Sequence, residues 1–205
     1  KGLTIHYAHT SHGSQINSGL QYLESKDSVY SYARRAASTE GLPAEEDPPA
    51  LRIYDGNPPE TYITPNDYWD NVSASDALDR TMAVANTGNY NFSMWAWCGQ
   101  QSSNSVATVQ RYLDNLNYLE SQYPNMRFIY MTGHTDGTQD NVPCDENNQP
   151  SGCSILARNN QMIREYCSDN NKVLFDFADI EKYDPDGVYY RNTRDNCIPL
   201  CTNYC

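Results

Sequence analysis

The sequence predicts an α/β fold in which helices cover both faces of a parallel sheet. Short apolar runs of strand length alternate along the chain with longer stretches whose apolar residues recur at helical spacing. This order is typical of a parallel sheet, because a helical crossover returns the chain to the same edge before each new strand. The 205 residues suffice to bury one core, and no internal repeat is present. We therefore expect a single domain over residues 1–205 with a cysteine-rich C-terminal tail.

The predicted elements follow from these runs. Five apolar runs are expected to be strands, and they are 3–8, 51–54, 92–97, 126–131 and 172–177. Four segments with helical spacing lie between them, and they are 16–23, 75–86, 106–123 and 155–166. The stripe over 106–123 is the strongest, and Pro124 stops it. The proline-rich, polar segments 39–49 and 57–71 are expected to be loops, and Ser75 is expected to cap the helix that follows the second of them.

The turn after the first strand is the predicted centre of the molecule. In a doubly wound sheet, ligands bind beyond the carboxyl ends of the strands, so the residues that follow each strand are expected to gather at one edge. These residues are Ser11, Gln100, His134 and Asp179. In the turn 9–15, helix amides point toward a ligand and Gly13 permits a close backbone approach. The same pattern also suits an ordinary helix start with Ser11 or Ser14 as N-cap.

Charge and cysteine content indicate the environment of the protein. The net charge of −12 disfavours nucleic acid and anionic membranes as partners, and no apolar run is long enough to span a bilayer. The chain opens at Lys1 without a signal peptide, which suggests a processed, secreted protein. The spacing of the seven cysteines favours disulfides over zinc, with an odd thiol left free or paired between chains. The disulfide candidates are Cys98, Cys144, Cys153, Cys167, Cys197, Cys201 and Cys205, and the glycosylation candidates are Asn71 and Asn91.

Two blocks of sequence resemble a known family. His9-Thr10-Ser11 follows the first strand, where SGNH (GDSL-type) hydrolases carry Gly-Asp-Ser, and Trp97-Cys98-Gly99-Gln100 ends the strand that carries their Gly-x-Asn-Asp. The resemblance implies a three-layer, flavodoxin-like αβα fold with Ser11 as nucleophile. It also implies that Gln100 and backbone amides near Gly13 hold the oxyanion. The chain further resembles a group of secreted proteins that share His-Thr-Ser-His-Gly-Ser, Trp-Cys-Gly-Gln and Gly-His-x-Asp-Gly blocks. This second resemblance implies a fold but no activity.

The sequence departs from the SGNH pattern at the catalytic base. No histidine occurs after His134, so the C-terminal Asp-x-x-His of the family is missing. A serine needs a neighbouring base to act as a nucleophile at neutral pH. His134 is the relocated candidate, with Asp136 placed to orient its ring. The alternative interpretation makes 132–137 a tight turn shaped by glycine and aspartate.

Other chemistry at this edge stays open. His12 adjoins Ser11, but neighbouring side chains in an extended turn diverge. Cys98 suggests a thiol nucleophile with His134 as partner, whereas a disulfide or an inert buried thiol is the alternative. A transition-metal site is a further hypothesis, with the candidate ligands His9, His12, His134 and Asp136.

The acidic residues allow two interpretations. Calcium is a possible ligand of the carboxylates in one predicted loop, although solvated acids are the common alternative. These carboxylates are Asp136, Asp140, Asp145 and Glu146, and Asp184-Pro-Asp186-Gly187 matches a fragment of a calcium loop. Asp176 and Asp179 are expected to shape the site or cap a turn rather than to act as a catalytic pair. No other cofactor is expected.

These observations lead to two hypotheses of function. The first is a secreted serine esterase that acts on acylated carbohydrate, because Tyr62, Tyr68 and Trp69 offer sugar-binding rings in the second loop. The second is a non-catalytic extracellular module that binds glycan or assembles into homo-oligomers. The missing histidine, the tyrosine-rich composition and the odd cysteine favour the second hypothesis.

Overall fold

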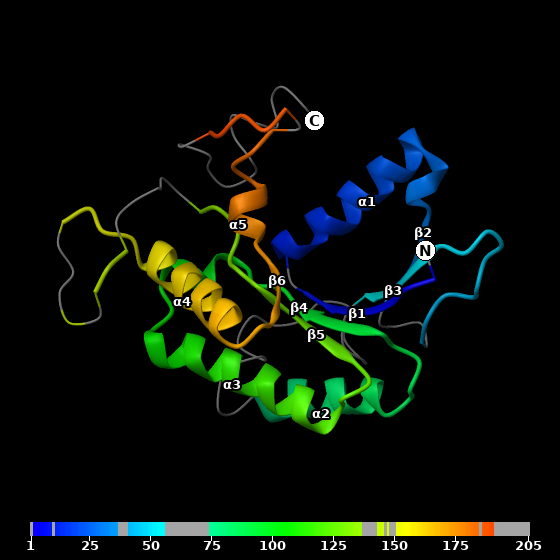
Figure 1. Cartoon of the computed structure of the whole chain (residues 1–205), viewed down its shortest axis with the longest axis horizontal. Coiled ribbons are helices and arrows are strands. Elements are labelled where there is room, and N and C mark those ends of the chain that lie inside the picture. Colours follow the sequence, from blue (N-terminus) through cyan, green and yellow to red (C-terminus); the bar gives the residue numbers. More distant parts are fainter. Residues whose placement is uncertain are drawn as a thin grey trace.

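The computed structural model describes residues 2–9, 11–36, 41–55, 74–136, 143–145, 147, 151–184 and 186–190. Its centre is a six-stranded parallel sheet with the order β2-β3-β1-β4-β5-β6 (Figure 1). The strands are β1 (Thr4–Ala8), β2 (Tyr32–Ala36), β3 (Leu51–Asp55), β4 (Phe92–Trp95), β5 (Arg127–Met131) and β6 (Val173–Phe175). The chain places β2 and β3 on one side of β1 and the later strands on the other. The order therefore reverses between β1 and β4, where such sheets bind ligands.

Helices cover both faces of this sheet. They are α1 (Ser14–Lys26), α2 (Ala74–Ala85), α3 (Val106–Gln122), α4 (Ile155–Asp169) and α5 (Phe177–Ile180), with short 3₁₀ turns η1 (Ser11–Gly13), η2 (Ser28–Tyr30) and η4 (Gly99–Ser102). α1 and α5 lie on one face, and α2, α3 and α4 lie on the other (Figure 1). The predicted α/β fold with a flavodoxin-like, three-layer arrangement is confirmed.

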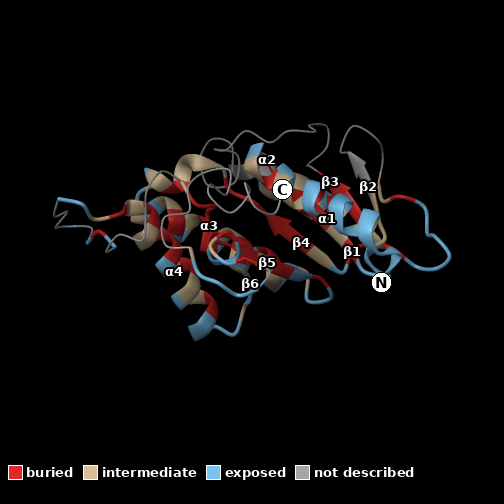
Figure 2. Cartoon of the chain, turned by 90° about the horizontal axis from the view of Figure 1, so that it is seen from above, coloured by how far each residue is buried: buried red, intermediate tan, exposed pale blue. Residues whose placement is uncertain are grey.

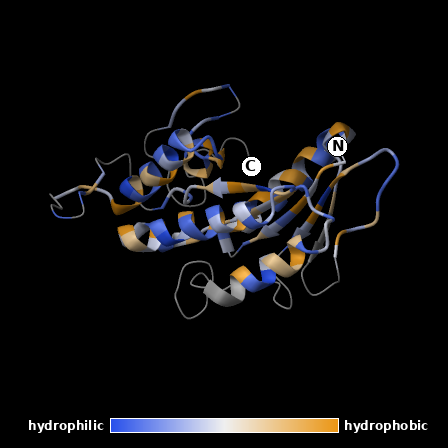
Figure 3. Cartoon of the chain, turned by 60° about the horizontal axis from the view of Figure 1, so that its bottom comes forward, coloured by the Kyte–Doolittle hydropathy of each residue, from blue (hydrophilic) through white to orange (hydrophobic). Residues whose placement is uncertain are grey.

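The two faces of the sheet carry separate apolar clusters. The larger one joins the sheet to α2, α3 and α4, and α3 contributes the fully buried Val109, Tyr112, Leu113, Leu116 and Leu119. Apolar and hydrophilic residues alternate along α3 and α4 in Figure 3, as expected for helices with one buried face. The smaller cluster lies under α1 and α5. Figure 2 shows the consequence, since α1 is largely exposed while the central strands β1 and β4 are mostly buried.

Local signals explain where the helices begin. Ser105 accepts a hydrogen bond from the amide of Thr108, and Ser154 accepts one from the amide of Ala157, so both serines act as N-caps. Ser75 is not a cap, because α2 already begins at Ala74. The helix therefore begins two residues before the position that a cap at Ser75 implies.

Two elements were not predicted from the sequence. β2 contains two arginines, and it needs no apolar run because, within the described residues, it is an edge strand that pairs with β3 alone. The last strand was expected to continue through Phe177, but β6 ends at Phe175. Asp176 then caps α5 by accepting a hydrogen bond from the amide of Asp179, which turns the chain out of the sheet. Of the predicted loops, 41–49 has no helix or strand, and 57–71 lies outside the described residues.

The structure forms one of the predicted disulfides. Cys144 and Cys153 are bonded, with their Cα atoms 4.9 Å apart. Cys98 and Cys167 are free thiols, which corrects their place among the disulfide candidates. Cys197, Cys201 and Cys205 lie outside the described residues, as does the glycosylation candidate Asn71.

Asn91 lies just before β4 and serves a structural purpose. Its carboxamide oxygen accepts hydrogen bonds from the amide and the hydroxyl of Thr4, which links the starts of β1 and β4. Ser93 of the same sequon is fully buried and contacts His6. The glycosylation of Asn91 stays a prediction. Among the described residues, no helix has both the length and the apolar character needed to cross a bilayer.

Candidate functional site

Three neighbouring strands bring the candidate residues to one edge of the sheet. β1, β4 and β5 lie side by side, as expected, and their carboxyl ends point the same way. The segments that follow them are η1, the Cys98–Ser102 region with η4, and residues 132–136. Asp179, the fourth residue expected here, lies exposed on α5 after β6. Because β1, β4 and β5 are neighbours, the segments that follow them lie together at this edge.

Ser11 lies on an unusual backbone at the first of these turns. Its side chain is exposed, and its φ of +29° falls in the left-handed region that residues with a Cβ seldom adopt. Such a conformation costs on the order of 1–3 kcal/mol and is often found at functional sites. Neither Ser11 nor Ser14 caps α1, because Gly13 occupies the N-cap and no side chain caps the helix there. The interpretation of this turn as an ordinary serine cap is therefore wrong.

Gly13 is required by the packing beneath the turn. A Cβ at this position would clash with the Cβ of His9 and lie 2.8 Å from the hydroxyl of Tyr7. That hydroxyl donates a 2.7 Å hydrogen bond to the Gly13 carbonyl. Burial, and then the carboxylate of Asp55, raise the pKa of Tyr7 well above its ordinary value, so the phenol keeps its proton and remains a donor.

His9 belongs to the same buried support. Its ring stacks on Tyr7 with centroids 4.7 Å apart, and its Nε2 contacts Asp55. Asn17 of α1 donates a 3.2 Å hydrogen bond to Asp55. His9 therefore faces β3 and α1, and it anchors the turn rather than joining the other histidines in a metal site.

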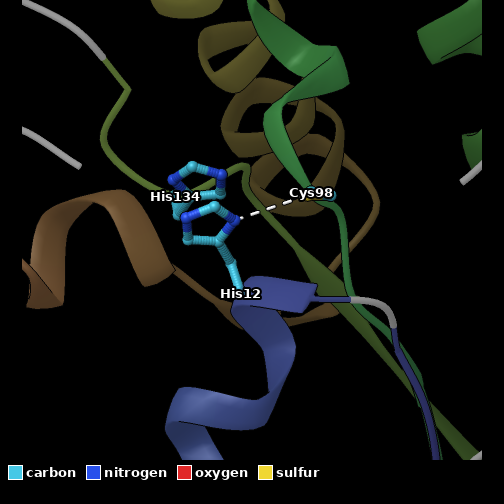
Figure 4. A group of neighbouring side chains, drawn as sticks. All are labelled: His12, Cys98 and His134. Carbon is cyan, nitrogen blue, oxygen red and sulfur yellow. Dashed lines mark hydrogen bonds between the residues drawn. The ribbon is translucent and has the colours of Figure 1, made fainter. Parts of the chain in front are cut away.

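Two histidines and a cysteine meet above this support. The rings of His12 and His134 stack with centroids 3.7 Å apart and an interplanar angle of 17° (Figure 4). His12 Nδ1 lies 3.4 Å from Cys98 Sγ, the contact drawn as a dashed line in Figure 4. One nitrogen from each ring and the sulfur lie within 4.8 Å of one another. We call these three residues the imidazole–thiol cluster.

The two free cysteines differ in their electrostatics. Burial by itself raises the pKa of Cys98, but the hydrogen bond with His12 and the amides of Gly99 and His12 more than offset it. The net result is a pKa below the ordinary thiol value, which favours thiolate. Burial raises the pKa of Cys167 to about 12, so that thiol stays protonated inside α4. Cys98 is therefore a partly buried free thiol whose surroundings lower its pKa, and its reactivity stays a prediction.

His134 is oriented by a backbone carbonyl. It is buried, and its Nδ1 lies 2.7 Å from the carbonyl oxygen of Thr135. A carbonyl only accepts, so this bond assigns the proton to Nδ1 and leaves Nε2 as the basic nitrogen of the neutral ring. Thr135 is held in turn by Glu181, which accepts hydrogen bonds from its amide at 2.6 Å and its hydroxyl at 3.0 Å.

Asp136 does not take the expected place at Nδ1 of His134. Its carboxylate accepts a 2.6 Å hydrogen bond from the hydroxyl of Ser102 on η4. The orienting role predicted for Asp136 therefore falls to the Thr135 carbonyl. Asp136 and Ser102 instead line a hollow of about 240 Å³ that also borders Cys153 and the first turn of α4.

The predicted calcium ligands also have other roles where they are described. Asp184 accepts hydrogen bonds from the amides of Asp186 and Val188 and from the hydroxyl of Tyr190, so it shapes a turn. Asp140 and Glu146 lie outside the described residues. The imidazole–thiol cluster is the one group in the described part of the chain where three possible ligands lie this close together.

Gln100 lies partly buried in η4, two residues after Cys98. Its side-chain oxygen accepts a 3.1 Å hydrogen bond from the amide of Cys98. This bond assigns the oxygen of the carboxamide to the backbone and leaves the NH₂ group as the donor for a ligand.

No known protein family and no curated protein matches the sequence. Among solved structures, BT4096, described as a gut microbial diltiazem-metabolizing enzyme, is similar with a TM-score of 0.47 and 13% sequence identity. The similarity covers 86% of this chain and 37% of that chain, so the chain spans little more than a third of that protein's length.

Residues that the sequence did not single out hold the last two turns together. Asn160 of α4 accepts a 2.8 Å hydrogen bond from the amide of Gly133, and Asn159 donates to the carbonyls of Gln101 and Asn104 at 2.9 and 3.0 Å. A Cβ at Gly133 would lie 2.8 Å from the side chain of Gln101. The available signal was the polar Asn159 within the apolar stripe of a helix, because a buried amide there needs partners.

Proposed function

We propose that the chain is a serine hydrolase that cleaves ester bonds at the carboxyl edge of β1, β4 and β5. The observation that carries the proposal is the exposed Ser11 on a left-handed backbone between a strand and a helix. A strained strand-to-helix turn is the device by which α/β hydrolases expose a nucleophilic serine. The resemblance of the His9–Ser11 and Trp97–Gln100 blocks to SGNH hydrolases supports the same assignment.

In the proposed reaction, His134 acts as the base. Ser11 Oγ attacks the ester carbonyl and passes its proton to Nε2 of His134, while the Thr135 carbonyl keeps the other ring nitrogen protonated. The new Oγ–C bond gives a tetrahedral intermediate, whose oxyanion accepts hydrogen bonds from the Gln100 NH₂ group and from amides at the start of α1. The imidazolium then protonates the leaving alcohol. A water molecule, activated in the same way, releases the acid and restores Ser11.

Acylated carbohydrate is the substrate class proposed first. The aromatic residues behind this prediction lie at 62, 68 and 69, outside the described residues, so the class rests on composition and on the SGNH resemblance. The hollow beside Ser102 and Asp136 offers polar groups for an acyl or sugar substituent. The Cys144–Cys153 disulfide supports the proposal that the protein is secreted.

An ester panel of acetylated sugars and simple aryl esters tests the proposal. We expect Ser11→Ala to lower kcat/KM by at least about 10³-fold, because the nucleophile is lost. Ser14→Ala is the matched control, since Ser14 is exposed in the first turn of α1 and caps nothing. Its activity should equal that of the unaltered protein. A fluorophosphonate probe should label the unaltered protein and the Ser14→Ala variant, but not the Ser11→Ala variant.

Two results would overturn the proposal. Equal turnover in the Ser11→Ala variant would exclude the serine, and loss of turnover in Cys98→Ala with Ser11→Ala still active would assign the nucleophile to the thiol. The absence of turnover and of probe labelling across the whole panel would instead favour the non-catalytic glycan-binding or self-assembling module. Circular dichroism of each variant establishes that it is folded.

A further inference from the structure

We propose that His12, Cys98 and His134 form a binding site for a zinc ion. Each residue supplies one ligand atom, and the three residues lie in the segments that follow three adjacent strands. This set differs from the histidine–aspartate set suggested by the sequence, because His9 faces Asp55 and Asp136 faces Ser102.

The distances suit a tetrahedral ion. Two ligands bound to zinc at about 2.0–2.3 Å lie roughly 3.3–3.6 Å apart in tetrahedral geometry. In the cluster, His12 Nδ1 and Cys98 Sγ are 3.4 Å apart, and all three atoms lie within 4.8 Å of one another. One separation therefore already matches a tetrahedral site, and ion binding would draw in any pair that approaches the 4.8 Å limit. The stacked rings already bring both imidazoles to the same side of the sulfur (Figure 4).

The hydrogen bond on the far side of His134 is a second, independent observation. Metal-binding histidines typically donate their other ring N–H to a carbonyl or a carboxylate, which fixes the tautomer and the ring orientation. His134 does this with the Thr135 carbonyl at 2.7 Å, and Glu181 fixes Thr135 through two further bonds. Nε2 is thereby the nitrogen presented to the cluster.

The donor set selects the kind of metal. Imidazole nitrogen and thiol sulfur suit zinc, whereas calcium and magnesium prefer oxygen ligands. Three protein ligands leave the fourth position of a tetrahedral ion for water or a small ligand, as in catalytic rather than structural zinc sites. A consequence, which rests on the proposed function, is that bound zinc occupies Nε2 of His134 and so inhibits the esterase.

Cobalt(II) serves as the spectroscopic probe for zinc in the purified chain with the Cys144–Cys153 disulfide intact. We expect one equivalent of Co²⁺ to give a near-ultraviolet thiolate-to-cobalt band and visible bands typical of tetrahedral coordination, both removed by one equivalent of Zn²⁺. Cys98→Ser should abolish the thiolate band. Cys98→Ser and His12→Gln should each weaken zinc binding in calorimetry by more than about 100-fold, since losing even a hydrogen-bond partner of a ligand typically costs about 10–100-fold.

Cys167→Ser is the matched control, because Cys167 is the other free thiol of the described chain and lies buried in α4. It should retain the band and the affinity. Absence of the band in the unaltered protein, or a band that persists in the Cys98→Ser variant, would overturn the site. Thermal unfolding without metal shows whether each variant is folded. Because the readout is metal binding, a failed esterase assay leaves this result unaffected, and a failed metal titration leaves the serine proposal unaffected.

Discussion

Asp176 connects three elements behind the candidate site. It accepts two hydrogen bonds from Arg164 of α4, at 2.6 and 2.8 Å, and one from the hydroxyl of Thr132 at the end of β5. It also caps α5 through the amide of Asp179. The sequence-based expectation that Asp176 caps a turn is thus confirmed. Its contacts fix the end of β5 two residues before His134.

Asp176→Asn is expected to destabilise the protein by about 1–3 kcal/mol at neutral pH, because it breaks a charge-assisted pair and weakens a cap. Burial alone raises the pKa of Asp176, but the bonds from Arg164, then Thr132, bring it below the ordinary value of 3.8. The folded state therefore binds fewer protons than the unfolded state. The stabilisation is complete above the unfolded-state pKa and is lost as the pH falls through the lower folded-state pKa.

Urea denaturation between neutral pH and about pH 2.5 measures this difference. The stability gap between the unaltered protein and the Asp176→Asn variant should be constant at neutral pH and should shrink below about pH 4. Asp179→Asn is the control, because α5 uses the backbone amide of Asp179 and its side chain is exposed. A gap that widens on acidification would contradict the sign of the pKa shift.

The positions of some site residues could be predicted from the sequence, but their partners could not. Ser11, Gln100 and His134 could be placed at one edge because each follows a strand, and those three strands are neighbours in the sheet. The partner of His134 could not be predicted. A carbonyl and a nearby carboxylate compete for the same ring nitrogen, and the backbone path after β5 decides in favour of the carbonyl of Thr135.

The turn between β1 and α1 requires a glycine at position 13. Gly13→Ala should destabilise the protein by about 1–3 kcal/mol and should also reduce ester turnover, because the new methyl group meets His9 and Tyr7 in a filled core. Gly19→Ala, inside the helix that follows this turn, is the control. No atom lies within 4 Å of a Cβ there, so alanine should stabilise α1 by about 0.5–1 kcal/mol.

Chemical denaturation of both alanine variants, with the ester assay alongside, separates these effects. Equal stability of the two variants would show that the packing at Gly13 relaxes without cost. A Gly13→Ala variant that is destabilised but fully active would show that the turn tolerates displacement.

Elements were predictable where burial imposes a pattern. α3 was expected over 106–123 and is found at Val106–Gln122, because five of its residues are buried in one stripe. β2 and α5 were missed for the opposite reason. An edge strand with two arginines and a four-residue helix started by one cap leave little periodicity in the sequence.

The whole molecule has two unequal layers around its sheet. α3 and α4 each bury five residues, whereas α1 buries Asn17 alone among its thirteen residues. Burial of apolar area is the main source of stability for a packed helix. The helix that continues from the Ser11–Gly13 turn is therefore held more weakly than α3 and α4. By contrast, Cys98 and His134 follow β4 and β5, and these two strands pack against the larger apolar cluster.

Hydrogen exchange should reveal this asymmetry in the native state. We expect the amides of α3 and α4 to exchange with the free energy of global unfolding, and those of α1 to exchange through a local opening of lower free energy. Mass spectrometry of peptides from each helix, at several low denaturant concentrations, measures both. The α1 exchange should depend little on denaturant, since a local opening exposes little surface. Equal protection in α1 and α3 would contradict the expectation.

A local opening of α1 would carry Ser11 and His12 away from Cys98 and His134. Zinc bound to the imidazole–thiol cluster would join the two sides, so it should slow exchange in α1 more than in α3.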